Sequence, residues 1–94
     1  MTTGRNIERA LARRFSPMAR FRMARGLKQK DVALRGGLHE STVSKLEIGA
    51  RAATEPQVRK IAKGLRTPIY RAQDLLRLSR QWAGHGLKKK ASRS

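Results

Sequence analysis

The side chains best suited to chemistry lie between His39 and Gly49. Val43 and Leu46 are three residues apart, which places them on one face of a predicted helix. The opposite face, here called the polar face, carries four hydrogen-bonding side chains: Glu40, Ser41, Ser44 and Lys45. A carboxylate can accept from cytosine N4, a lysine can donate to guanine O6 and N7, and hydroxyls can do either. The polar face therefore has the chemistry needed to contact base edges.

The same residues do not form a recognisable catalytic or metal site. Ser41, Ser44, His39 and the few acids show no pattern of nucleophile, base and orienting group. His39 and His85 have no second ligand at a useful spacing. The chain has no cysteine, which excludes disulfides and thiolate chemistry and fits a reducing compartment. We therefore predict a protein that is not an enzyme and that needs no cofactor or metal.

Charge points to a polyanionic partner. The 94 residues hold 23 Lys and Arg against 6 Asp and Glu, a formal net charge of +17. Phosphates would relieve the self-repulsion and release counterions, so binding should weaken with salt. RNA, an anionic membrane surface or a solubility tail would also explain charge alone. The sequence has neither a signal peptide nor an apolar run of about 20 residues, so a soluble, cytoplasmic protein is expected.

The polar face needs a scaffold, and the sequence predicts five core helices with no strands. Ser16-Pro17 begins the first helix and Gly26 ends it. The second covers about 29–35 before Gly36-Gly37, and the third begins at 39 or 41 and ends near 46–48. Thr54 and then Thr67-Pro68 begin the last two. Helical spacing predicts these inward residues: Met18, Phe21, Ala24 or Arg25, Val32, Ala33, Val43, Leu46, Val58, Ile61, Ala62, Leu65, Ile69, Ala72, Leu75 and Leu76.

The two ends of the chain are set apart from this core. Residues 1–15 are predicted to form a basic arm or short helix, because Ile7, Leu11 and Phe15 recur four residues apart among arginines. Residues 81–94 hold two glycines and a lysine run, and we expect a disordered basic tail there. The expected organisation is one compact all-α domain at 16–80 between these ends.

Two short helices around a glycine-containing turn suit insertion of the second helix into a major groove. At this point a resemblance becomes specific. The segment from Gly26 to Arg51 resembles the helix-turn-helix of the phage Cro and cI repressor family, also called XRE-type. The similarity extends from Ser16 to Leu76, and includes Ile-Ala-Lys-Gly-Leu at 61–65 and Asp-Leu-Leu at 74–76. It implies a lambda-repressor-like fold that binds double-stranded DNA.

The resemblance also implies roles for individual residues. The polar face residues occupy the base-facing positions of the recognition helix, 40–47, although Glu40 could instead be an ordinary charge at a helix start. Gln29 should reach a phosphate and brace the start of that helix, or simply decorate its own helix. Arg22 and Glu47 match a structural ion pair between the first helix and the recognition helix. Thr42 and Arg51 match positions that touch the phosphate backbone, with capping and solvation respectively as the alternatives. Lys28 and Lys30 would add nonspecific attraction to phosphates, and His39 would act as a cap or a phosphate contact.

The chain departs from the family pattern at three positions. Gly36 stands where a larger apolar residue usually packs, His39 replaces the usual Ser or Thr cap, and Gly64 interrupts the fourth helix. Each should weaken a helix locally by about 0.5 to 1 kcal/mol.

The resemblance implies a transcription regulator, usually a repressor, that binds a palindromic operator as a homodimer. Candidate dimer contacts, which could equally pack inside one chain, are Tyr70, Leu75, Leu76, Leu78 and Trp82. The alternatives are an antitoxin or anti-activator that uses the same fold to bind a protein, and an architectural nucleoid or RNA-binding protein.

Overall fold

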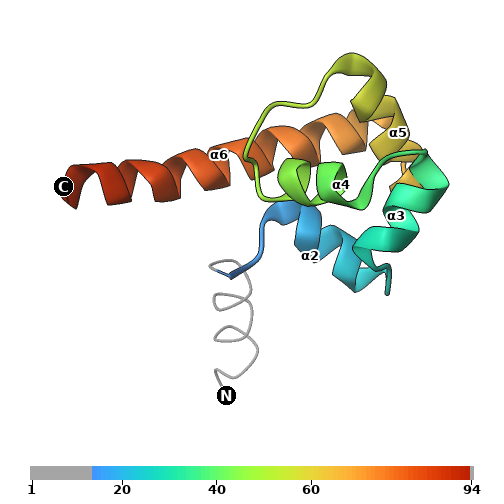
Figure 1. Cartoon of the computed structure of the whole chain (residues 1–94), viewed down its shortest axis with the longest axis horizontal. Helices are drawn as coiled ribbons and strands as arrows, with labels where there is room; N and C mark the ends of the chain where they lie inside the picture. Colours follow the sequence, from blue (N-terminus) through green and yellow to red (C-terminus); the bar gives the residue numbers. More distant parts are fainter. Residues whose placement is uncertain (1–13, 94) are drawn as a thin grey trace.

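Figure 1 shows a computed structural model of the protein. The structure describes residues 14–93, with side chains as far as Ala83, and five helices make up this part of the chain. They are α2 (Pro17–Ala24), α3 (Gln29–Gly36), α4 (Glu40–Glu47), α5 (Glu55–Leu65) and α6 (Ile69–Arg93). No strand occurs within 14–93, and the predicted all-α fold is confirmed. The predicted N-terminal arm, apart from Arg14 and Phe15, lies outside the described residues.

Predicted capping residues begin two of the helices. The Ser16 hydroxyl accepts a hydrogen bond from the Ala19 amide at 3.1 Å at the start of α2. At the start of α5 the Thr54 hydroxyl accepts from the Gln57 amide at 3.3 Å, and Gln57 Oε1 accepts from the Thr54 amide at 2.9 Å. Each cap satisfies amides that have no partner within the helix, which is why these helices begin where the sequence predicts.

The core lies where the inner faces of the five helices meet. Its buried members are Met18, Val32, Ala33, Val43, Leu46, Ile61, Ala62, Leu65, Ala72, Leu75 and Leu76, and Phe21 and Val58 pack against it partly buried. The prediction that Ile69 points inward is wrong, because Ile69 is 48% exposed at the first residue of α6. The buried face of α6 begins at Ala72, one turn later. Ala24, offered with Arg25 as an inward residue, is also exposed.

The two glycines interpreted as weak points permit a close approach of α3 and α5. A Cβ on Gly36 would lie 2.4 Å from the Lys60 carbonyl oxygen, and a Cβ on Gly64 would lie 2.5 Å from that of Val32. Both distances are too short for any real side chain, and both obstacles are backbone. Gly36 therefore does not leave a gap where a larger residue should pack. The two backbones fill that space.

The last helix differs most from the prediction. The sequence predicted a flexible tail from residue 81, whereas α6 continues as a helix to Arg93 and extends beyond the body of the molecule (Figure 1). Two glycines each disfavour a helix by about 1 kcal/mol, but the alanines, leucine and lysines around them are strong helix formers. The domain boundary at residue 80 stays a prediction. Within the body, α6 is joined to α2 by the buried Ser79 hydroxyl, which accepts from the Met18 amide at 3.1 Å.

Candidate nucleic-acid interface

A tight turn joins α3 to α4. The chain leaves α3 through Gly37, which has a left-handed conformation with a φ of 73°, and the Leu38 amide then donates to the Ala33 carbonyl at 2.8 Å. His39 occupies the N-cap position of α4 as predicted, but its side chain makes no capping hydrogen bond. The turn is thus held by a backbone hydrogen bond and by Leu38, which packs partly buried against the core.

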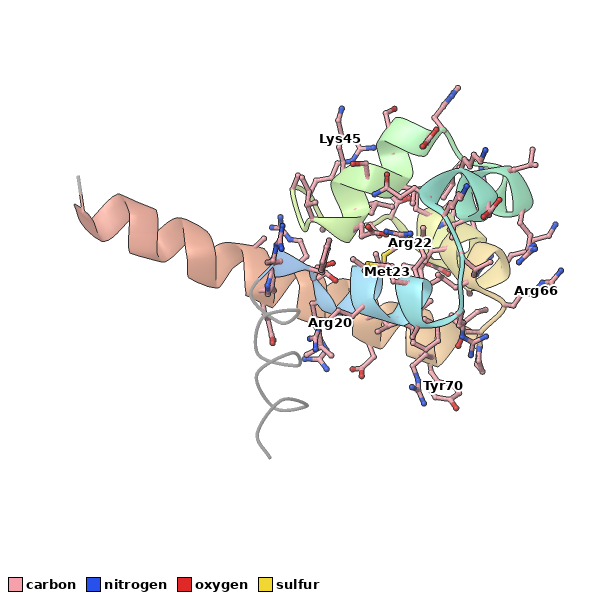
Figure 2. The ribbon with its side chains drawn as sticks, turned by 90° about the horizontal axis from the view of Figure 1, so that it is seen from below. Arg20, Arg22, Met23, Lys45, Arg66 and Tyr70 are labelled. Carbon is pink, nitrogen blue, oxygen red and sulfur yellow. The ribbon has the colours of Figure 1, made fainter. Side chains whose placement is uncertain are left out.

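The polar face of α4 is directed away from the core. Glu40, Ser41 and Lys45 are exposed and Ser44 is half-buried. In Figure 2 the Lys45 side chain points away from the body of the molecule. Among the described residues, no hydrogen bond or ion pair engages any of the four side chains. The structure therefore brings the predicted base-facing residues together on one accessible surface with free hydrogen-bonding groups.

The inner face of α4 is almost completely buried. Val43 and Leu46 have 0% and 1% of their surface exposed, and both belong to the core cluster. Burying two such side chains stabilises the docked helix by about 1.5 to 3 kcal/mol each. Since α4 has only eight residues, it would not be a stable helix alone, and packing holds it in place.

A buried carboxylate fixes the end of α4. Glu47 is 3% exposed, and its Oε2 accepts from Arg22 Nε at 2.7 Å while its Oε1 accepts from Arg22 Nη2 at 3.0 Å. Arg22 also donates through Nη1 to the Leu27 carbonyl at 2.7 Å. In this two-point contact the planar guanidinium donates two hydrogen bonds to one carboxylate, which gives a stronger ion pair than a single hydrogen bond would. The ion pair implied by the resemblance is therefore present, and it ties α2 to α4.

Gln29 lies at a different place from the one predicted. Its Nε2 donates to Glu47 Oε1 at 3.0 Å, so it braces the end of the recognition helix and not its start. The physical reason is that a buried carboxylate requires several donors, and Arg22 alone leaves acceptor capacity on Oε1. Gln29 is half-buried at the first residue of α3, so α2, α3 and α4 all meet at Glu47.

A further contact, which the sequence analysis missed, holds the residues after α4. Arg80 Nη1 donates to the Gly49 carbonyl at 2.9 Å, and a Cβ on Gly49 would lie 2.4 Å from the Ser79 carbonyl oxygen. Gly49 is buried with a φ of 72°. The two partners are 31 residues apart, and no local pattern in the sequence signals such a pairing. We call Glu47 and Gly49, which lie on either side of the exposed Ile48, the anchored end of α4.

The remaining residues predicted to contact phosphates lie before α4, at its start, or after it along the chain. Lys28 and Lys30 are exposed at the start of α3, where the Lys28 amide donates to Asp31 Oδ2 at 2.8 Å. His39 is exposed, and Thr42 is half-buried in the first turn of α4. Arg51 is exposed in the segment that follows the anchored end. Their proximity to the polar face along the chain suits phosphate contacts, whose assignment stays a prediction.

The described residues offer little support for a metal, membrane or catalytic site. Among the described residues, no group of three or more His, Asp or Glu side chains could hold a metal ion, and no helix is long and apolar enough to cross a membrane. A shallow hollow is lined by Ala52, Ala53, Val58, Gln73, Leu76, Arg77 and Arg80. Its walls hold no carboxylate, hydroxyl or thiol, so it offers no nucleophile or acid.

Comparisons with known proteins were made on the whole chain. A family model described as helix-turn-helix (HTH_3) matches residues 18–71, which is more than half of the chain and includes α2 to α5. Comparison with curated proteins gave no match, and neither did comparison with solved structures.

Proposed function

The chain belongs to the XRE-type, Cro/cI-like helix-turn-helix family of DNA-binding transcription regulators, and from this premise we propose that it recognises one operator sequence through α4. The observation that best supports this proposal is the contrast between the two faces of that helix. The inner face and anchored end are buried and bonded, whereas the polar face is accessible with its groups unengaged.

Insertion of α4 into the major groove fits its size and chemistry. Eight helical residues are about 12 Å long, close to the width of the groove of B-DNA. Lys45 would donate to guanine, and Ser41 and Ser44 would donate or accept according to the base. Glu40 would accept from cytosine N4, since a carboxylate beside phosphates is unfavourable without a donor.

Phosphate contacts would position this helix without reading sequence. Lys28, Lys30 and Arg51 supply cations on either side of α4, and His39 and Thr42 supply hydrogen-bonding groups at its start. Gln29 donates one amide hydrogen to Glu47 and so supports α4, which leaves its second amide hydrogen for a phosphate. Binding by these cations should weaken steeply between about 50 and 200 mM salt.

We infer further that the protein acts as a repressor on a palindromic operator, with two copies of α4 one helical turn apart. Of the residues considered for a dimer contact, Leu75 and Leu76 belong to the core and are unavailable. Tyr70 is exposed and Leu78 and Trp82 are half-buried on α6, and all three stay candidates. Sedimentation with and without a palindromic duplex would show whether two copies assemble.

A protein partner is the second candidate function. Met23, on α2, is an apolar side chain with 40% of its surface exposed, and it is the residue that a partner captured through the first helix, as by an antitoxin or anti-activator, would contact. The two functions differ in the effect of substitutions. Changing Met23 would abolish capture of such a partner, whereas changing Ser41 or Lys45 would abolish operator binding.

Selection from random duplexes at about 150 mM salt tests the proposed function. The proposal expects enrichment of one motif, composed of two inverted half-sites, and loss of that enrichment in the double variant Ser41→Ala/Lys45→Ala. Binding of all duplexes alike, or an unchanged motif with the double variant, would show that α4 does not recognise sequence.

A further inference from the structure

A second strongly basic surface lies where α5 gives way to α6. Five exposed residues define this surface, which we call the α5–α6 corner: Arg25, Lys63, Arg66, Tyr70 and Arg71. Tyr70 is 68% exposed, which is unusual for a large side chain with an aromatic ring. The corner combines four cations with one phenolic hydroxyl.

Backbone geometry brings these residues together. Arg66 ends α5 in a left-handed conformation with a φ of 55°, so that the chain reverses within three residues and begins α6. Arg25 joins the corner from α2, because its Nη1 donates to the Leu65 carbonyl at 3.4 Å and to that of Arg66 at 3.3 Å. Its guanidinium also lies 4.5 Å from the centre of the Phe21 ring. Arg25 is therefore fixed beside Arg66.

No carboxylate neutralises the corner. The ion pairs of the described residues join Arg22 with Glu47, Arg59 with Glu55, and Arg77 with Asp74. Asp74, the carboxylate nearest to Arg71 along α6, is thus held by another arginine. The corner consequently keeps its whole positive charge, which costs free energy in the folded state unless an anion binds there.

The corner and the polar face of α4 lie on different sides of the molecule. Figure 2 shows Tyr70 and Lys45 at opposite edges of the body, with Arg22 between them, and Arg66 on the side away from Lys45. A duplex seated on α4 lies on the Lys45 side. Tyr70 and Arg66 therefore lie away from the side of the body that the first duplex would cover.

We propose that the α5–α6 corner binds the phosphates of a second DNA duplex, so that the protein bridges two duplex segments. This inference rests on the proposed function, in which α4 holds the first duplex. Arginine forks pair with phosphate oxygens in two-point contacts, and the Tyr70 hydroxyl can donate to a third. Because none of these groups faces a base edge, binding at the corner is independent of sequence and sensitive to salt.

A retention assay tests the bridge. Biotinylated operator duplex is fixed on beads and saturated with the full chain, and a fluorescent duplex of unrelated sequence is then added at about 50 mM salt. The double variant Arg66→Gln/Arg71→Gln should retain about tenfold less fluorescent duplex than the unsubstituted protein, with its affinity for the single operator kept within about threefold. The matched control is Arg59→Gln/Lys60→Gln, which removes the same charge at exposed cations of α5 outside the corner and leaves the pair of Arg77 with Asp74 intact. This control should retain the second duplex within about twofold.

Two results would overturn the bridge. One is operator binding without retention of a second duplex, and the other is equal retention by the corner variant and the control. If the corner variant instead loses binding to polyglutamate while no second duplex is retained, the corner is a surface for an acidic protein and the assignment to DNA is wrong. Failure of the proposed function is distinguishable, since Ser41→Ala/Lys45→Ala would then leave single-operator binding unchanged.

Discussion

The polar face of α4 and the anchored end, which begins at the last residue of that helix, have opposite relations to the rest of the protein. Glu40 and Glu47 illustrate this, because both are carboxylates on α4. Glu40 is exposed and has no partner, whereas Glu47 is buried and accepts from both Arg22 and Gln29. The comparison shows that α4 is positioned from its far end, which leaves its polar face free for an external partner.

Removing the buried carboxylate should have the largest effect on this arrangement. Glu47→Ala leaves the partly buried Arg22 without its carboxylate, and we expect a loss of about 3 kcal/mol in the free energy of unfolding. Glu40→Ala is the matched control on the same helix and should change that free energy by less than about 0.5 kcal/mol. Thermal denaturation followed by circular dichroism measures both. Equal melting temperatures for the two variants would refute the claim that Glu47 anchors α4.

The glycine in the anchored end provides a second way to disturb it. Gly49→Ala introduces a Cβ against the Ser79 carbonyl at a positive φ, and we expect a loss of about 2 to 4 kcal/mol. Gly37→Ala is the control, because Gly37 has nearly the same φ, 73°, with no atom within 4 Å of the added carbon. It should lose about 1 to 2 kcal/mol from backbone conformation alone. Similar losses in chemical denaturation would mean that the contact with α6 is unimportant.

The polar face should behave in the opposite way. Lys45→Ala should reduce affinity for the selected operator by about 1 to 3 kcal/mol while the melting temperature stays unchanged, because Lys45 has no partner within the described structure. Lys60→Ala, an exposed lysine on α5, is the control for loss of one charge. Fluorescence anisotropy at constant salt compares them. If the two variants lose the same affinity, Lys45 acts only through its charge.

The smallest effect is expected at the contact between α6 and the anchored end. Arg80→Ala removes one hydrogen bond to the Gly49 carbonyl, which should cost about 1 kcal/mol of stability. Arg77→Ala breaks only an exposed ion pair with Asp74 and should cost less than about 0.5 kcal/mol. Urea denaturation resolves the difference. A larger loss with Arg77→Ala would contradict the role given to Arg80.

Local signals account for the parts of the fold that the sequence predicted. Ser16, Thr54 and the glycines after α2, α3 and α4 act within a few residues of their own position, so helix boundaries could be placed from them. The polar and apolar faces of α4 followed from helical spacing in the same way. The pairing of Arg22 with Glu47, by contrast, came from the family resemblance, since the two are 25 residues apart.

What the sequence could not predict depends on tertiary geometry. Helix propensity predicts that Gly36 and Gly64 weaken their helices, because propensity alone does not show that the backbones of Lys60 and Val32 approach them. Gln29 was placed at the wrong end of α4, since its partner is determined by where Glu47 is buried. The contact of Arg80 with Gly49 and the clustering of Arg25 with Arg66 likewise depend on how α6 and α2 pack.

The central claim is that the polar face of α4 recognises base sequence and the anchored end does not. The most direct test is the ratio of affinities for the selected operator and for a scrambled duplex, measured at about 150 mM salt for the unsubstituted protein and for Ser41→Ala/Lys45→Ala. The account predicts a ratio of about a thousand or more that falls at least about a hundredfold in the variant, with no change in melting temperature. A ratio that survives both substitutions would contradict it.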